Sequence, residues 1–217
     1  MSHHSKSENS NELKIEKNDT NDEKEQICKV VILGAAGVGK TSILNKYMYD
    51  NFPREYEVTV GIDFFTKKVQ FENSTIALQM WDTAGQEKYQ SLIPSYIRDT
   101  SVSIIVYSVD EPKSFSVAKQ WIDRVKQQNG EDSVFLLVGN KIDLEDKVSQ
   151  DDVKKYADAS KMKSILVSAK TGQGITEMFD TLLTIHKQNS KSKKTVDVIA
   201  QPILLSKQKE QTSSSCC

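Results

Sequence analysis

The segment Gly34-Ala-Ala-Gly-Val-Gly-Lys-Thr41 decides which fold this sequence can form. It follows the apolar run ICKVVIL at residues 27–33 and precedes TSILNKYMYD, whose pattern predicts a helix. Glycines at this spacing let successive backbone N–H groups point at phosphate oxygens, beside the positive end of a helix. Lys40 would reach the β and γ phosphates, and the Thr41 hydroxyl would bind Mg²⁺. The segment therefore predicts a nucleoside triphosphate site and leaves kinase, ATPase and GTPase chemistry open.

Apolar runs that predict strands alternate with helical patterns along the rest of the central region. Three of these runs each precede a helical pattern; they lie at residues 101–109, 133–140 and 164–169. Two others, at residues 64–71 and 75–81, flank a predicted hairpin turn at residues 72–74. This order predicts an α/β fold with a six-stranded, mostly parallel sheet, one antiparallel edge strand and helices on both faces. Ligands of such sheets bind beyond the carboxyl ends of the strands.

Two of the predicted helices carry further signals. Apolar residues at i, i+3 and i+4 spacing predict the buried face of a helix that follows residue 113, and Ser149 predicts the N-cap of a later helix. The residues of that buried face are Phe115, Ala118, Trp121, Ile122 and Val125.

Composition divides the 217 residues into one domain and two tails. Residues 1–25 hold four Lys against seven acidic residues and few large apolar side chains, which predicts a disordered polar extension. Residues 26–186 are enough for one domain with a substantial core. Residues 187–217 hold six Lys against two acidic residues, and we expect a flexible basic tail.

The same composition excludes some classes of function. The net charge is −1 and the central region has no basic excess, so we expect no nucleic-acid partner. No apolar run approaches the length of a membrane span, and the beginning of the sequence has no signal-peptide core. Cys28 lies within an apolar run, which predicts a buried small residue and not a reactive thiol.

Polar motifs follow three further predicted strands. They are Asp82-Thr-Ala-Gly85-Gln86, Asn140-Lys-Ile-Asp143 and Ser168-Ala-Lys170. A carboxylate at a strand end can hold Mg²⁺ through water, and a following glycine lets a backbone N–H reach the γ-phosphate. Together with the first loop, the stretches GAAGVGKT, WDTAGQ, NKID and SAK resemble the small GTPase family, in its order and across the whole central region.

The resemblance implies that the bound base is guanine. Asp143 would accept hydrogen bonds from the N1–H and the exocyclic amine, a donor pair that adenine lacks. Asn140 would contact the base edge and hold neighbouring loops together, the stem of Lys141 would cover the ring, and the Ala169 N–H would meet the guanine carbonyl. Phe52 matches an aromatic at the ring edge; its alternative role is that of a partly buried loop aromatic.

The resemblance also assigns the metal and the reaction. Thr41, Thr59 and Asp82 would hold Mg²⁺, with Thr59 available only while the γ-phosphate is present, and Gln86 would orient the attacking water. The segments around Thr59 and after Asp82 would be ordered by GTP. The nucleotide contacts implied in full are Ala36, Gly37, Val38, Gly39, Lys40, Thr41, Ser42, Phe52, Tyr56, Thr59, Gly85, Asn140, Lys141, Asp143, Ser168, Ala169 and Lys170.

The three Arg of the chain include no evident candidate for an arginine finger in cis. This predicts slow intrinsic hydrolysis that a GTPase-activating protein accelerates. Ala36 stands where Ras proper has a glycine, which leaves the geometry of that partner open.

VGIDFF and WDTAGQEKY resemble the Rab branch of the family, and SLIPSYIRDT resembles its Golgi-associated subgroup. The resemblance implies an effector surface at Ile62, Phe64, Trp81 and Tyr96, although these aromatics could also simply pack the sheet against a helix. It further implies vesicle trafficking as the function, with effectors, an exchange factor, a GTPase-activating protein, GDI and escort protein as partners of a monomer.

The chain ends in Cys216-Cys217, which resembles the terminal cysteines that carry two geranylgeranyl groups in Rab proteins. Two lipids give stable membrane attachment where one gives reversible binding. The Golgi subgroup more often separates these cysteines by one residue. The apolar patch Ile203-Leu-Leu205 resembles the contact that escort and GDI proteins use, with a chance apolar patch as the alternative. The expected location is the cytoplasmic side of Golgi or related membranes, with a cytosolic GDI-bound pool.

Two other functions remain open at this point. A P-loop nucleotide kinase would need an arginine-rich lid, and three Arg in the chain argue against it. An adaptor that binds GTP without hydrolysing it would have no use for Gln86 and Thr59.

Overall fold

A computed structural model describes residues 26–53, 59, 61–83 and 93–199, without the side chains of residues 93 and 191–199. The described part of the chain contains one six-stranded sheet in the order β2-β3-β1-β4-β5-β6. The strands are β1 (Gln26–Gly34), β2 (Ile62–Phe71), β3 (Ser74–Thr83), β4 (Val102–Ser108), β5 (Phe135–Asn140) and β6 (Lys163–Leu166). The helices are α1 (Lys40–Tyr49), α2 (Ile93–Ile97), α3 (Pro112–Asn129), α4 (Gln150–Ala159) and α5 (Ile175–Ile199).

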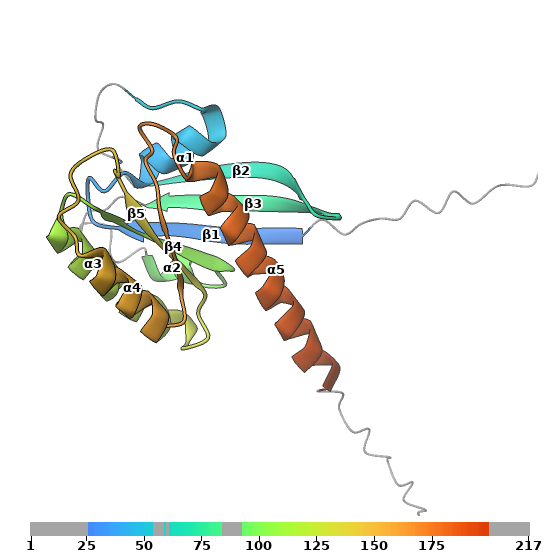
Figure 1. Cartoon of the computed structure of the whole chain (residues 1–217). Helices are drawn as coiled ribbons and strands as arrows, with labels where there is room; N and C mark the ends of the chain where they lie inside the picture. The colour runs from blue at the N-terminus through green and yellow to red at the C-terminus, as the bar shows by residue number, and fades with distance from the viewer. Residues whose placement is uncertain (1–25, 54–58, 60, 84–92, 200–217) are drawn as a thin grey trace, which may run out of the picture.

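The sheet confirms the predicted topology. Strand β2 pairs antiparallel with β3 at one edge, and β3, β1, β4, β5 and β6 run parallel (Figure 1). The parallel strands are almost entirely buried in the centre; every residue of β4 and of β5 is buried. Strand β2 alternates between exposed and half-buried residues, because one of its faces contacts solvent.

Helices cover both faces of the sheet. Helices α1 and α5 share a core with one face, in which Leu44 and Phe179 are fully buried. Helices α2, α3 and α4 share a second core with the other face. All five residues predicted for the buried face of α3 are buried, and the Ser149 side chain accepts a hydrogen bond from the Asp152 N–H as the N-cap of α4. Both predictions are confirmed.

Cys28 is part of the first core and has no exposed surface. Burial raises the pKa of its thiol to about 12, although a hydrogen bond with Ser101 opposes this. The thiol is therefore neutral at physiological pH, which confirms its predicted role as a small buried residue.

Helix α5 runs to Ile199 and crosses the boundary that the sequence analysis placed at residue 186. The sequence holds no Gly or Pro between Gly174 and Pro202, so no strong helix-ending signal precedes that point. At the crossing, Lys187 forms an ion pair with Glu72 in the β2–β3 turn. The other predicted segment, the polar extension at residues 1–25, lies outside the described residues, and the proposed division into domain and tails stays a prediction.

Candidate functional site

The glycine-rich loop connects the carboxyl end of β1 with the first residue of α1, as predicted. Gly37 and Gly39 have positive φ angles of 74° and 94°, which residues with a Cβ rarely adopt. A Cβ on Gly34 would lie 2.3 Å from the Val106 carbonyl oxygen on β4, and one on Gly39 would lie 2.3 Å from the Asn140 Nδ2. The loop therefore requires glycine both for its backbone shape and for its close packing against β4 and β5.

Lys40 is the first residue of α1 and is 5 % exposed. Its ammonium folds back over the loop and donates hydrogen bonds to the carbonyl oxygens of Gly34 (3.2 Å) and Ala35 (2.9 Å). Burial lowers the pKa of Lys40 to about 8, and the nearby Asp82 carboxylate partly opposes this. A buried cation at the N-terminus of a helix is suited to bind a phosphate.

The three residues predicted to hold Mg²⁺ meet at the amino end of α1. The Thr41 Oγ1 lies 2.6 Å from the Thr59 Oγ1 and donates to the Asp82 Oδ2 at 2.5 Å. Asp82 is fully buried, and its Oδ1 has no hydrogen-bond partner among the described residues. Burial raises the pKa of Asp82 to about 6, with opposing contributions from the Thr41 hydroxyl and Lys40.

A buried carboxylate oxygen without a donor is costly unless a cation or water satisfies it. Hydroxyl and carboxylate oxygens are the protein ligands that Mg²⁺ prefers when phosphates supply the others. The residues present therefore fit the predicted metal. The strand register explains the arrangement, because Asp82 on β3 lies opposite Ile32 on β1, two residues before the loop begins.

A cavity of about 330 Å³ lies next to the glycine-rich loop, at the ends of β5 and β6. Its lining is Gly37, Gly39, Ser42, Phe52, Asn140, Lys141, Asp143, Leu144, Ala169 and Lys170. Nine of these ten residues were predicted from the sequence as nucleotide contacts. Leu144 was not; it directly follows Asp143 in the chain and is the one apolar side chain that this loop adds to the wall.

Asn140 connects the two halves of the site. Its Nδ2 donates to the Val38 carbonyl oxygen in the glycine-rich loop at 2.8 Å, and its Oδ1 accepts from the Ala169 N–H at 3.1 Å. The predicted role of holding loops together is thus visible in the structure. The predicted contact of the Ala169 N–H with a guanine carbonyl stays a prediction and would compete with this second bond.

Asp143 is positioned by the loop after β6. Its Oδ1 accepts a hydrogen bond from the Ser168 Oγ at 2.6 Å, and the Lys170 ammonium lies 3.8 Å from its Oδ2. The Ser168 hydroxyl in turn accepts from the Thr171 N–H. A carboxylate held in this way at the wall of a cavity can accept hydrogen bonds from the edge of a base. Ser168 was predicted as a nucleotide contact. It is fully buried and its hydroxyl instead orients the Asp143 carboxylate.

Of the other predicted contacts, Val38 is fully buried and offers its backbone, and Ala36 lies exposed in the loop. Five further predicted residues cannot be placed. Tyr56, Gly85, Gln86 and the pair Cys216-Cys217 lie outside the described residues.

An aromatic cluster is formed by Phe64 on β2, Trp81 on β3 and Tyr96 on α2. The ring centroids of Phe64 and Trp81 are 4.8 Å apart, and those of Trp81 and Tyr96 are 5.3 Å apart. Trp81 also packs against the second core, which agrees with the alternative packing role. Phe64, however, is 49 % exposed, so the cluster also presents apolar surface to solvent. Ile62, the fourth residue predicted for this surface, is the first residue of β2 and pairs with Thr83 on β3.

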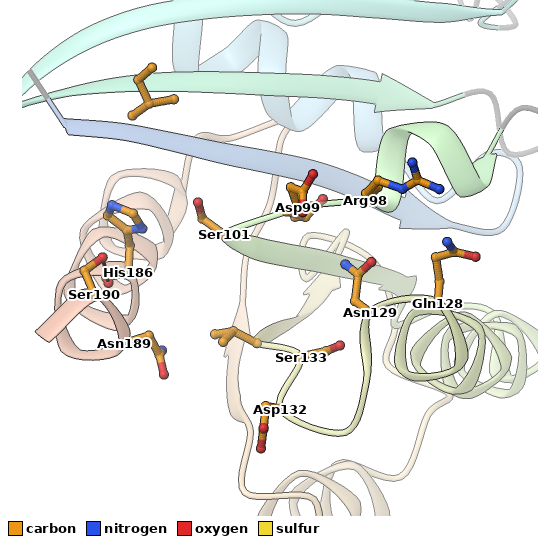
Figure 2. A pocket seen from close by; sticks show the side chains of 13 residues that line it. Arg98, Asp99, Ser101, Gln128, Asn129, Asp132, Ser133, His186, Asn189 and Ser190 are labelled. Atoms are coloured by element: carbon orange, nitrogen blue, oxygen red, sulfur yellow. Dashed lines mark hydrogen bonds between the residues drawn. The ribbon is translucent and has the colours of Figure 1, made fainter. Parts of the chain in front are cut away.

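A second cavity, of about 550 Å³, lies at the opposite end of the sheet (Figure 2). It is bounded by the beginnings of β1, β4 and β5 and by α5, where His186 faces it. Its charged lining residues, Arg98, Asp99 and Asp132, are of both signs. None of the predicted site residues lines it, whereas nine of them line the first cavity.

The fold and this site define a P-loop protein with a cavity beside the loop, whose wall is mostly apolar and includes the Asp143 carboxylate. Residues 29–188 match the model of the Ras family, which includes every described motif of the site. The chain belongs to the Ras family and is a small GTPase by that membership. Members of this family bind GTP or GDP together with Mg²⁺. Among the described residues, no helix is both long enough and apolar enough to cross a membrane.

Proposed function

We propose that the protein is a Rab-type GTPase switch that cycles between GTP-bound and GDP-bound states to regulate vesicle trafficking. The observation that supports this most is the Asn140 side chain, which joins the phosphate loop to a base pocket walled by Asp143. A nucleotide kinase would need an arginine-rich lid, and the chain has only three Arg. The aromatic cluster supports the Rab assignment, because its exposed Phe64 gives a partner an apolar contact beside the segments that GTP would order.

The roles of the residues follow from the geometry. Lys40 would bind the β and γ phosphates, the N–H groups of the glycine-rich loop would surround them, and Asp143 would fix the base. Thr41, Thr59 and Asp82 would hold Mg²⁺, which when bound neutralises charge on the phosphates. Gln86 would orient the water for attack on the γ-phosphorus, so that GTP and water yield GDP and phosphate.

Gln86→Leu is expected to slow single-turnover hydrolysis at least about tenfold, because leucine cannot orient a water molecule. The measurement is phosphate release from preloaded GTP, with Gln127→Leu on the exposed face of α3 as the matched control.

Competition between fluorescent GDP and unlabelled ADP or ATP is measured in parallel. Preference for adenine nucleotides would support the kinase, and absence of hydrolysis in the wild type would support the adaptor. Measurable hydrolysis at the same rate in wild type and variant would refute the role of Gln86.

Cys216→Ser with Cys217→Ser is expected to leave GDP affinity unchanged and to move the protein from the membrane to the soluble fraction of cells. Each single variant retains one lipid site and should give partial, reversible attachment, because one chain binds membranes only marginally. Ser214→Ala serves as the control. Membrane attachment of the double variant at the wild-type level would refute lipid anchoring, and imaging of the wild type against Golgi markers tests the proposed location.

A further inference from the structure

Lys141 has a backbone conformation that is unusual for a lysine. Its φ angle is 70°, in the left-handed region that residues with a Cβ rarely adopt. The turn around it is fixed by two backbone hydrogen bonds, from the Leu144 N–H to the Lys141 carbonyl (2.9 Å) and from the Ile142 N–H to the Val167 carbonyl (3.3 Å). Such a conformation persists only where the surroundings hold it, and it occurs most often at binding sites. Here it directs the Lys141 side chain along the wall of the base cavity.

The ammonium of Lys141 has a charged partner outside the cavity. The Asp110 Oδ1 lies 3.7 Å from the Lys141 Nζ, and both side chains are about 30 % exposed, at 30 % and 31 %. Asp110 follows β4 and does not line the cavity itself. It reaches Lys141 because Ser108 and Asn140, which end β4 and β5, lie side by side in the sheet.

Asp110 is itself held in place. The buried Ser108 hydroxyl donates a hydrogen bond to its Oδ1, the same oxygen that faces Lys141. This bond holds the pKa of Asp110 below its usual range, and the charge of Lys141 adds to the effect. The carboxylate is therefore ionised at neutral pH, and a side chain fixed by a buried partner loses little further freedom on pairing.

We propose that Asp110 is a positioning residue of the nucleotide site, which holds the Lys141 ammonium at the rim of the cavity so that the aliphatic stem covers the base. The inference rests on the proposed guanine-nucleotide function of that cavity. Asp110 acts through Lys141 and makes no contact with the nucleotide. Its removal frees a long side chain that must then be ordered again when the base binds.

The test is the dissociation rate of a fluorescent GDP from the full chain with Mg²⁺ present. Asp110→Asn keeps the shape and can keep the bond to Ser108 but removes the charge, and we expect dissociation to accelerate roughly three- to tenfold. Glu131→Gln is the matched control, because Glu131 forms an ion pair with Lys126 at 3.2 Å, away from the cavity. This control should change the rate less than about 1.5-fold.

Three further readouts separate positioning from a general structural effect. In a Lys141→Ala background, Asp110→Asn should add nothing, because its target is gone. Raising NaCl from about 0.05 to 0.5 M should accelerate dissociation more in the wild type than in Asp110→Asn, because salt screens a partly exposed pair. Inosine diphosphate, which lacks the exocyclic amine, should show the same acceleration as GDP, because the stem covers the ring and does not read that amine.

An unchanged rate in Asp110→Asn would overturn the inference, as would equal acceleration with and without Lys141. The salt comparison within the wild type needs no variant, and a dissociation rate that salt does not alter would also count against it. If the wild type does not bind guanine nucleotides at all, the proposed function is refuted, and the inference with it. Tight binding by the wild type with an inert Asp110 refutes the inference alone.

Discussion

Asp143→Asn is expected to lower the affinity for GDP by about 3 kcal/mol or more, roughly a hundredfold or greater. The Asp143 side chain is 15 % exposed and accepts a hydrogen bond from Ser168, so its remaining acceptor capacity faces the cavity. Guanine presents two donors on one edge, and a carboxylate accepts both. An asparagine keeps one acceptor and places an N–H₂ group against a donor, which replaces attraction by repulsion.

The same substitution should raise the affinity for xanthosine diphosphate, whose 2-oxo group can accept from the new amide. Calorimetric titration of nucleotide-free protein with both diphosphates measures the exchange of specificity. Asp132→Asn, an exposed change at the far end of the sheet, is the control. If Asp143→Asn retains wild-type preference for GDP over xanthosine diphosphate, this carboxylate does not select the base.

Lys40→Met is expected to weaken binding of GDP and of non-hydrolysable GTP by at least a hundredfold, with the larger loss for the triphosphate. The residue supplies a buried cation to the loop, and charge-assisted bonds to phosphate are among the strongest that a side chain makes. Methionine keeps the length of the chain but leaves the Gly34 and Ala35 carbonyl oxygens without this donor.

Because this change can also affect stability, thermal unfolding of the nucleotide-free protein accompanies the affinity measurement. Lys126→Met provides the control, since Lys126 pairs with Glu131 away from the site. Affinities within about threefold of the wild type would show that the phosphates do not depend on this ammonium. A variant that is less stable and yet binds both nucleotides normally would assign Lys40 to folding alone.

The sequence predicted the sheet well, because its strands are near-continuous apolar runs bounded by turn residues. Strands such as β4 and β5 are buried along their whole length, so their sequences are continuous apolar runs that are easy to assign as strands. It did not predict α2, a helix of five residues whose sequence carries no repeated apolar face. Nor did it predict the end of α5, since the polar composition after His186 was interpreted as a tail although nothing there stops a helix.

The sequence also predicted nine of the ten residues that line the cavity beside the glycine-rich loop. Lys40 could be assigned from the spacing of its motif and Asp143 from the resemblance to small GTPases, because each motif folds as one local unit; their contacts with a nucleotide stay predictions. The pair of Asp110 and Lys141 could not be assigned in this way, because these residues are far apart in the chain and meet only through the register of β4 with β5. The orphaned oxygen of Asp82 likewise depends on burial that no local pattern reveals.

One amide, that of Asn140, fastens the loop that would grip phosphate to the loop that completes the base pocket. The phosphates and the base of a nucleotide would therefore be released together and not one after the other. A partner that moves either loop away from Asn140 would break one of these two hydrogen bonds and so loosen the other loop as well. We therefore expect nucleotide exchange to open both loops in one concerted step.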